Sequence, residues 1–186
     1  MIKGALLIID VMKDFFEKGG KFYYPEAERT IPTIMKTIKL FRRKRYPIFH
    51  IFDKHRKGKP DFEFLKLPEH FTFDNLNEIV VLKDEIKKDD YIIFKRRFSA
   101  FFKTDLDLIL REEGVYEVFV VGCKTNVCVR ATVQDAFQNG FKVFVIKDAV
   151  SSNFKHLHDA SLEDMERYMG KVIIFDDLIQ ILDVKT

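Results

Sequence analysis

Residues 118–128 read VFVVGCKTNVC, an apolar run that ends at a glycine and is followed by two cysteines. The apolar side chains over 116–121 predict a strand buried on both faces, and the helical spacing of apolar residues over 126–139 predicts a helix. Cys128 therefore falls in a first helical turn. There, unpaired backbone N–H groups and the helix dipole favour the thiolate and can hold an oxyanion. The segment is typical of a nucleophile at a strand-to-helix turn.

The two cysteines can also have a purely structural role. Free cysteines are most often small buried hydrophobic residues, and Cys123 at the strand end fits that description. Cys128 is a catalytic candidate only if an acid, a base and an electrophile-binding group reach the same place from other parts of the chain.

Four other apolar segments end at charged residues. They are Ala5–Ile9 before Asp10, Pro47–Phe52 before Asp53, Tyr91–Phe94 before Lys95, and Val143–Ile146 before Lys147 and Asp148. The carboxyl ends of parallel strands share one edge of a sheet, where α/β proteins bind their ligands. We therefore expect Asp10, Asp53, Lys95 and Cys128 to meet at one edge.

The remaining pattern predicts one α/β domain over residues 1–186. The composition is 47% hydrophobic, and no Pro/Gly/Ser linker divides the chain. Helical patterns alternate with the strands: one starts near Thr30 and Pro32 and reaches Phe41, one covers 106–110 and one covers 157–169. A sixth strand is predicted at Val172–Phe175, and Asp176 is the predicted N-cap of a last helix. This alternation predicts a six-stranded parallel sheet with helices on both faces, a Rossmann-like architecture.

Composition argues against several function classes. The two cysteines are five residues apart, which suits a reducing compartment, and neither a signal peptide nor an apolar membrane span is recognisable. We therefore expect a cytoplasmic protein without a membrane partner. The net charge is only +3, and the basic clusters at 42–45 and 54–59 are explained by a helix end and a solvated loop, so nucleic acid is not an expected partner.

With these residues assembled, the chain resembles the isochorismatase-like cysteine hydrolases, a superfamily that includes nicotinamidases/pyrazinamidases, carbamoylsarcosine amidases and ureidoacrylate amidases. The similar segments are ALLIIDVMKDF at 5–15, Gly19-Gly20, KRRFSAF at 95–101, TDL at 104–106, GCKTNVCV at 122–129, Asp135-Ala136, Asp148-Ala149 and His158. Each segment is weak alone, but their order and spacing together are specific. The resemblance implies the isochorismatase fold over nearly the whole chain.

The family resemblance also implies a reaction mechanism. Cys128 attacks an amide carbonyl to form a thioester, and Asp10 takes the thiol proton and returns it to the departing ammonia or amine. Lys95 keeps Asp10 ionised. A cis peptide bond between Cys123 and Lys124 turns the backbone N–H groups of Lys124 and Cys128 toward the oxyanion. The expected partner is then a small amide substrate, and the family implies a homo-oligomer.

The loop after the second strand carries four side chains of metal-binding types, two carboxylates and two imidazoles. Nicotinamidases have a similar order of donors, and the resemblance implies a divalent metal, zinc first and iron or manganese as alternatives, bound by Asp53, His55, Glu63 and His70. The metal would bind the pyridine nitrogen of nicotinamide and fix the ring. Phe15 would stack on that ring, with Leu67 nearby. In a basic loop the same side chains can also be merely solvated.

Two alternatives remain at this point. The turn Thr125–Cys128 resembles that of amidases acting on carbamoyl or ureido groups, so an N-carbamoylsarcosine- or ureidoacrylate-type amidase is the second candidate. A phosphoacceptor receiver domain also has acids and a lysine at strand ends. It needs two adjacent acids for magnesium, whereas Asp10 is flanked by Ile9 and Val11, and no G-x-G-x-x-G or P-loop supports a nucleotide-binding protein.

Overall fold

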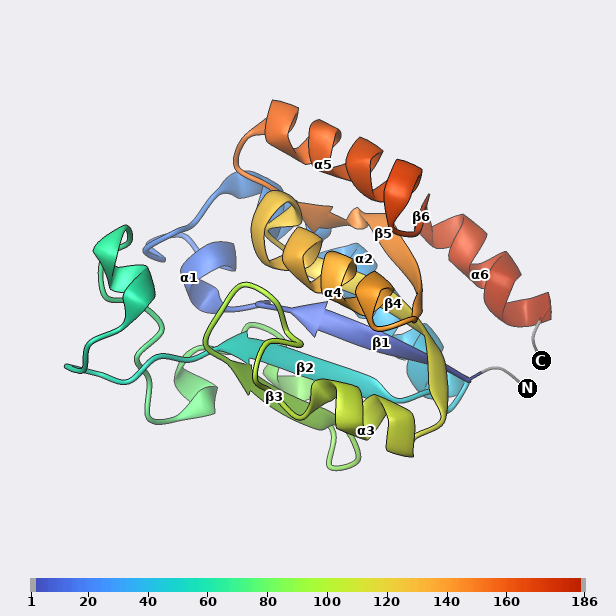
Figure 1. Ribbon diagram of the computed structural model, residues 1–186, viewed down its shortest axis with the longest axis horizontal. Coiled ribbons are helices and arrows are strands. Elements are labelled where there is room, and N and C mark those ends of the chain that lie inside the picture. Colours follow the sequence, from blue (N-terminus) through green and yellow to red (C-terminus); the bar gives the residue numbers. More distant parts are fainter. Residues whose placement is uncertain (1–2, 185–186) are drawn as a thin grey trace.

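Six parallel strands form one sheet in the order β3-β2-β1-β4-β5-β6 (Figure 1). The computed structural model describes residues 3–184. The strands are β1 (Lys3–Ile9), β2 (Ile48–Asp53), β3 (Tyr91–Lys95), β4 (Val115–Cys123), β5 (Lys142–Ser151) and β6 (Lys171–Ile173). The prediction of a six-stranded parallel α/β fold is confirmed.

Helices cover both faces of this sheet. They are α1 (Lys13–Phe16), α2 (Pro25–Arg43), α3 (Leu106–Glu112), α4 (Arg130–Gln138), α5 (Lys155–Tyr168) and α6 (Phe175–Val184), with short 3₁₀ turns at Phe62–Leu65, Leu76–Glu78 and Lys83–Glu85 and a π-helical turn, η4, at Thr125–Val129. α2 and α6 pack on one face, and α3, α4 and α5 pack on the other. Over residues 3–184, no helix combines the length and apolar character needed to cross a membrane.

The strands are continuously apolar because both faces are covered. In β1, Leu6 and Ile8 point into the core beneath α2 and α6, while Leu7 and Ile9 point into the core beneath α3, α4 and α5. Successive side chains of a strand point to opposite faces, so a strand between two helical layers has no polar face. β3 lies at the edge and departs from this pattern, with Ile92 and Phe94 partly exposed. In β4, Tyr116 is exposed at the start of the segment predicted to be buried.

The position of the candidate site follows from the strand order. The chain runs from β1 through α2 to β2 and β3 on one side, and then crosses through α3 to β4 on the other side of β1. The order therefore reverses between β1 and β4, and a crevice opens outside their carboxyl ends, where doubly wound sheets bind ligands. In Figure 1 this edge lies to the left, where α1 and the loop after β2 gather.

The starts of two helices, α2 and α6, differ from the sequence prediction. α2 begins at Pro25 rather than near Thr30, because proline suits the first helical position and Glu26 and Glu28 favour the first turn; Pro32 lies inside the helix. α6 begins at Phe175, so Asp176 lies within its first turn and is not the N-cap. Carboxylates of Asp148 and Asp177 accept the N–H groups there instead.

β5 also extends beyond the predicted end at residue 146. Its register against β4 shifts between Val120 and Gly122, so that Gly122 pairs with Val150 and Cys123 with Ser151. The irregularity leaves Lys147 and Asp148 exposed within the strand. These two charged residues therefore do not end β5 as the sequence suggested.

We expect Gly122→Ala to destabilise the fold strongly. Gly122 has a φ of +113°, and an added Cβ would lie 2.0 Å from the carbonyl oxygen of Ile9 in β1. Overpacking and backbone strain together predict a loss of roughly 3 kcal/mol or more in the free energy of unfolding, measured by urea denaturation.

Gly140→Ala is the matched control. Gly140 has a φ of +81° but an added Cβ would meet nothing within 4 Å, so only the strain of roughly 1 to 2 kcal/mol remains. Equal losses in the two variants would contradict the close approach of β1 and β4.

Candidate functional site

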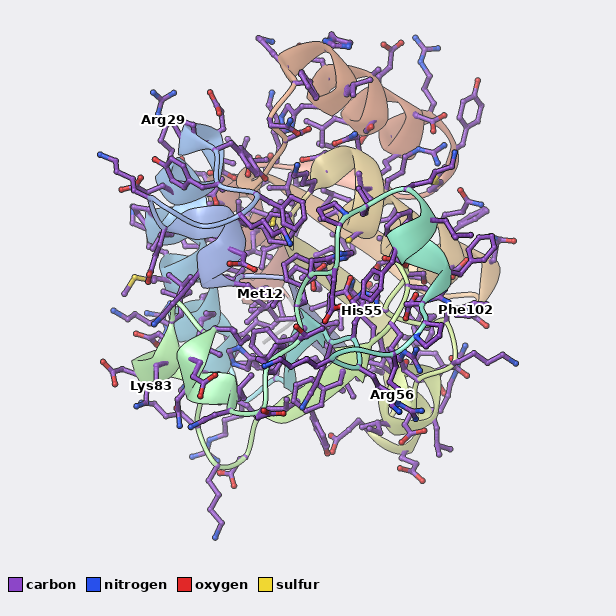
Figure 2. All side chains as sticks on the ribbon, turned by 90° about the vertical axis from the view of Figure 1, so that its left-hand side faces the viewer. Met12, Arg29, His55, Arg56, Lys83 and Phe102 are labelled. Carbon is purple, nitrogen blue, oxygen red and sulfur yellow. The ribbon has the colours of Figure 1, made fainter. Side chains whose placement is uncertain are left out.

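Four sequence-predicted residues lie together at the carboxyl edge of the sheet. Asp10 follows β1, Asp53 and Lys95 are the last residues of β2 and β3, and Cys128 lies in η4, which follows β4. Figure 2 looks onto this edge, with His55 near its middle. Parallel register explains the arrangement, because Asp53 pairs directly with Lys95 and β2, which carries Asp53, lies between β3 and β1.

Lys95 is the centre of the group. Its Nζ lies 2.9 Å from Asp10 Oδ2, 3.2 Å from Asp53 Oδ2 and 3.6 Å from Cys128 Sγ. The other carboxylate oxygen of Asp10 accepts a 2.9 Å hydrogen bond from the backbone N–H of Asp53. Lys95 and Asp10 are fully buried, and Cys128 is 6% exposed. The structure therefore brings an acid, a cation and a thiol into contact away from bulk water.

The charges of this group follow from burial and pairing. Burial disfavours the ammonium of Lys95, but Asp10, Cys128 and Asp53 raise its pKa well above the ordinary value, so it is a cation. Burial raises the pKa of Asp10, and Lys95 opposes that shift. Burial also raises the pKa of Cys128 well above the ordinary value. This differs from the sequence expectation of a resting thiolate, because desolvation outweighs Lys95 at this turn.

The turn that holds Cys128 is fixed by side-chain hydrogen bonds from the residue after β5 and from α5. The Cys123–Lys124 peptide bond is cis, as the family resemblance implied. Thr125 Oγ1 lies 2.9 Å from His158 Nδ1, and the Ser152 hydroxyl donates a 2.6 Å hydrogen bond to the side-chain oxygen of Asn126. The sequence pattern did not identify Ser152, because its partner is 26 residues away.

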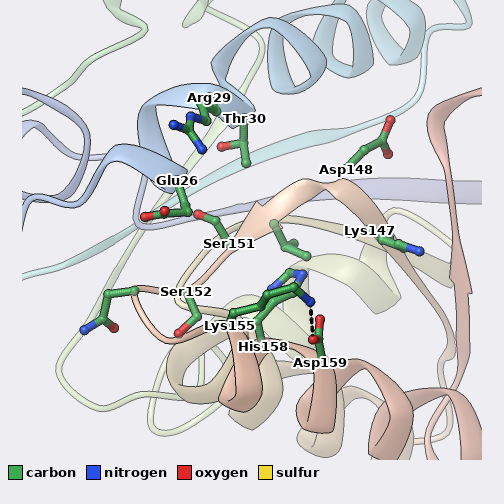
Figure 3. Close-up of a pocket in the computed structure, with 12 residues that line it drawn as sticks. Glu26, Arg29, Thr30, Lys147, Asp148, Ser151, Ser152, Lys155, His158 and Asp159 are labelled. Carbon is green, nitrogen blue, oxygen red and sulfur yellow. Dashed lines mark hydrogen bonds and ion pairs between the residues drawn. The ribbon is translucent and has the colours of Figure 1, made fainter.

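His158 and Ser152 line a groove separate from the thiol. Figure 3 shows this groove, about 740 Å³ in volume, with the Lys155–Asp159 ion pair beside His158. Its other charged side chains include Arg29, Lys147 and Asp148. The groove lies against the back of the Cys128 turn, and the contacts of His158 and Ser152 support that turn.

The four predicted metal ligands form a buried cluster. One ligand atom of each of Asp53, His55, Glu63 and His70 lies within 4.8 Å of the others. His55 Nε2 is 3.0 Å from Asp53 Oδ1 and 3.6 Å from Glu63 Oε2, and His70 Nε2 is 3.8 Å from the same Glu63 oxygen. Two imidazoles and two carboxylates are a donor set that suits zinc, iron or manganese.

Hydrogen bonds orient both imidazoles toward the cluster. His70 Nδ1 lies 2.7 Å from the carbonyl oxygen of Pro68, which can only accept, so Nδ1 carries the proton and Nε2 presents a lone pair. His55 Nδ1 lies 2.9 Å from Asp61 Oδ2, which favours the same tautomer. Asp61 is the residue here that sequence reasoning missed; its position two residues before Glu63 was the available signal. Such a carboxylate behind a histidine is typical of metal sites.

Unpartnered atoms inside the cluster fit a cation. Asp53 Oδ1, His55 Nε2 and both carboxylate oxygens of Glu63 are buried, and none has a hydrogen-bond partner within residues 3–184. Burial and the neighbouring charge of Asp53 raise the pKa of Glu63. Buried lone pairs directed at one another are costly unless a positive charge joins them. The residues present therefore fit a divalent metal.

A cavity of about 280 Å³ joins the thiol to this cluster. Its lining includes Asp53, Glu63, His70 and Cys128, and the predicted substrate contacts Phe15 and Leu67 are both among its walls. Sequence reasoning missed the remaining side chains of the lining: Phe22, Phe71, Phe98, Lys124 and Val127. Aromatic walls with a few polar groups at the ends suit a small flat molecule.

Known proteins share this arrangement of the chain. An isochorismatase-like hydrolase from Alkaliphilus metalliredigens is 35% identical with a TM-score of 0.88, over 96% of this chain and 98% of that one. A pyrazinamidase from Pyrococcus horikoshii in complex with zinc is 31% identical with a TM-score of 0.85, over 93% and 99% of the two chains. Nicotinamidase 3 of Arabidopsis thaliana is 31% identical over 87% of this chain and 79% of its own.

The family assignment rests on a match over most of the sequence. Residues 4–177 match the isochorismatase domain, a span that contains Asp10, Lys95 and Cys128 as well as the metal-ligand cluster. The chain belongs to the isochorismatase family of hydrolases.

Proposed function

We propose that this hydrolase is an amidase that cleaves a small carboxamide through a Cys128 thioester, with nicotinamide as the first candidate substrate and nicotinate and ammonia as products. The observation that carries the proposal is the contact of Lys95 Nζ with both Asp10 and Cys128, beside an aromatic cavity that Cys128 lines. A buried acid and thiol joined by one cation have the composition of a nucleophile with its base.

In the proposed reaction, the Cys128 sulfur attacks the amide carbonyl while its proton passes to Asp10. The C–N bond then breaks, the proton returns to the leaving nitrogen, and ammonia departs from the thioester. Water, deprotonated by Asp10, attacks the thioester carbon and releases the carboxylic acid and the thiol. The raised pKa of the buried Asp10 suits a group that must both accept and donate this proton.

Lys95 and two backbone groups stabilise the charges in this scheme. The Lys95 ammonium faces the thiol and the acid, so it favours the negative charge that moves between them. We assign the backbone N–H groups of Lys124 and Cys128 to the oxyanion of the tetrahedral intermediates. Donors already fixed by the turn stabilise such an oxyanion without reorganisation.

Asp53, His55, Glu63 and His70 would hold the divalent metal, with zinc as the first candidate. When bound, the metal supplies a Lewis-acid contact for a lone pair of the substrate, such as a pyridine nitrogen. Phe15 and Leu67, on the walls of the same cavity, would confine the ring so that its carboxamide faces Cys128.

Cys128→Ala is expected to abolish ammonia release from nicotinamide and to leave the circular dichroism spectrum and thermal midpoint nearly unchanged. Cys128 lines the cavity whereas Cys123 is fully buried, so iodoacetamide should label Cys128 first. Mass spectrometry of the labelled peptides measures the order. Full activity of the alanine variant, or earlier labelling of Cys123, would overturn the assignment of the nucleophile.

Asp10→Asn should lower kcat by about a hundredfold or more, because the amide keeps the shape of the side chain but cannot act as a base. The reaction is followed by enzyme-coupled ammonia detection. Asp148→Asn is the control, since Asp148 also follows an apolar strand segment but lies exposed in β5. Equal activity in both variants would exclude Asp10 as the base.

Protein purified without a histidine tag should contain close to one zinc, iron or manganese per chain by elemental analysis. His55→Ala should lose this metal, and Asp61→Asn should bind it roughly ten- to a hundredfold more weakly because His55 loses its orienting carboxylate. His156→Ala is the control: it removes an exposed histidine of α5, and this variant should keep the metal. Melting curves with added metal provide a readout independent of turnover.

A different result would favour the second candidate. If the protein carries no metal and hydrolyses N-carbamoyl or ureido substrates instead of nicotinamide, the nicotinamidase proposal fails. The N-carbamoylsarcosine/ureidoacrylate-type amidase then replaces it with the same Asp10, Lys95 and Cys128 chemistry.

A further inference from the structure

Lys124 places a second cation in the cavity that contains Cys128. The residue lines that cavity and is partly buried. Its Nζ lies 5.8 Å from the ring centre of Phe15 and 5.2 Å from that of Tyr24. Contacts with the faces of aromatic rings hold an ammonium in position without neutralising it.

Three other cations around the site are each paired with an acid. Lys95 contacts Asp10 and Asp53, and Arg96 and Arg97 both contact Asp61. By contrast, no carboxylate within residues 3–184 forms a hydrogen bond or ion pair with Lys124. The cavity therefore contains one positive charge that the protein leaves unbalanced.

The surroundings of Lys124 strengthen this point. Burial lowers the pKa of its ammonium, and the nearby groups that act in the opposite direction are the thiols Cys123 and Cys128. An anion entering the cavity would compensate a partly desolvated cation, which is the situation in which a charge-assisted hydrogen bond is most favourable.

The polar groups of the cavity come from two different segments of the chain. The acids Asp53 and Glu63 belong to the cluster after β2, whereas Lys124 directly follows β4 and its Nζ contacts rings of the segment between β1 and α2. An anion bound at Lys124 would therefore not compete with the metal ligands for the same atoms. Cys128, four residues after Lys124, lines the same space.

We propose that the side chain of Lys124 is a specificity determinant that binds a carboxylate of the substrate, so that small carboxamides bearing a carboxylate are hydrolysed in preference to uncharged ones. This inference rests on the proposed amidase function and, within it, favours the N-carbamoylsarcosine/ureidoacrylate-type candidate, whose substrates bear a carboxylate, over nicotinamide, which bears none. It concerns the side chain of Lys124 alone and is separate from the proposed oxyanion contact of its backbone N–H.

Matched pairs of amides test the proposal. Succinamate and succinamide differ only in that a carboxylate replaces one carboxamide, and glutaramate with glutaramide gives the same comparison for a chain one carbon longer. Ammonia release is measured for each amide with zinc-supplemented protein. The readout is the ratio of kcat/KM for the anionic amide to that for its uncharged partner.

Lys124→Met removes the charge and keeps the length of the side chain. It should lower this ratio about ten- to a hundredfold, mainly through a higher KM for the anionic amide, which is the range expected for one hydrogen bond to a charged group. Lys124→Arg keeps the charge and should retain most of the preference. Lys39→Met, on the exposed side of α2, changes the net charge equally and should leave the ratio unchanged.

The outcomes separate this inference from the proposed function. An equal loss on both members of a pair assigns Lys124 to the reaction step or to the fold and overturns the specificity role, as does an unchanged ratio. A binding measurement covers the case in which no amide is turned over. Succinamate and glutaramate are titrated calorimetrically into Cys128→Ala and into the double variant that also carries Lys124→Met. Weaker binding in the double variant supports the anion contact even though the amidase proposal fails. Equal binding in the two proteins, or no binding to either, refutes the anion contact.

Discussion

The buried ammonium of Lys95 is the interaction on which the carboxyl edge of this protein depends. A fully buried lysine is costly unless opposite charges surround it, and here Asp10 and Asp53 lie at 2.9 Å and 3.2 Å. The two acids would repel each other without the cation between them. Three adjacent strands, β1, β2 and β3, are thus joined at their ends by one charge cluster, and the thiol of Cys128 is added from the fourth.

The segment after β3 connects the catalytic group to the metal-ligand cluster. Lys95 contacts Asp10, while the next two residues, Arg96 and Arg97, contact Asp61. Asp61 in turn orients His55 in the cluster. A displacement of the β3 end would therefore disturb both groups at once, because the orientation of His55 depends on Asp61. His70 is oriented separately, by the carbonyl oxygen of Pro68.

The β4 end shows why small residues and bulges matter at a functional edge. Gly122 allows the backbone of β4 to approach Ile9 of β1, and the irregular pairing with β5 lets that strand continue to Ser151. Because β5 is longer, Ser152 lies where its hydroxyl can bond to Asn126, and His158 of α5 contacts Thr125 in the same way. The turn that carries Cys128 is consequently supported by elements far away in sequence, and its thiol lines a cavity separate from the groove of His158 and Ser152.

Sequence alone determined the architecture and three of the four predicted charged strand ends, the exception being Lys147 and Asp148, which lie within β5. Continuous apolar runs require a sheet covered on both faces, and parallel strands place Asp10, Asp53, Lys95 and the Cys128 turn at one edge, so these features follow from local pattern and topology. Helix starts were less predictable. The start of α2 depends on a proline at the first helical position, and the start of α6 depends on caps supplied by Asp148 and Asp177.

The ionisation of the site and the shape of the cavity were decided only by tertiary structure. A helix start favours a thiolate, but the depth at which the turn is buried reverses that preference, and depth is not visible in a local sequence. Asp61 behind His55, the supports of the Cys128 turn and the unpaired charge of Lys124 depend on contacts across the fold. Residue type reveals which groups can take part in chemistry, whereas burial and partners fix the charge that each one carries.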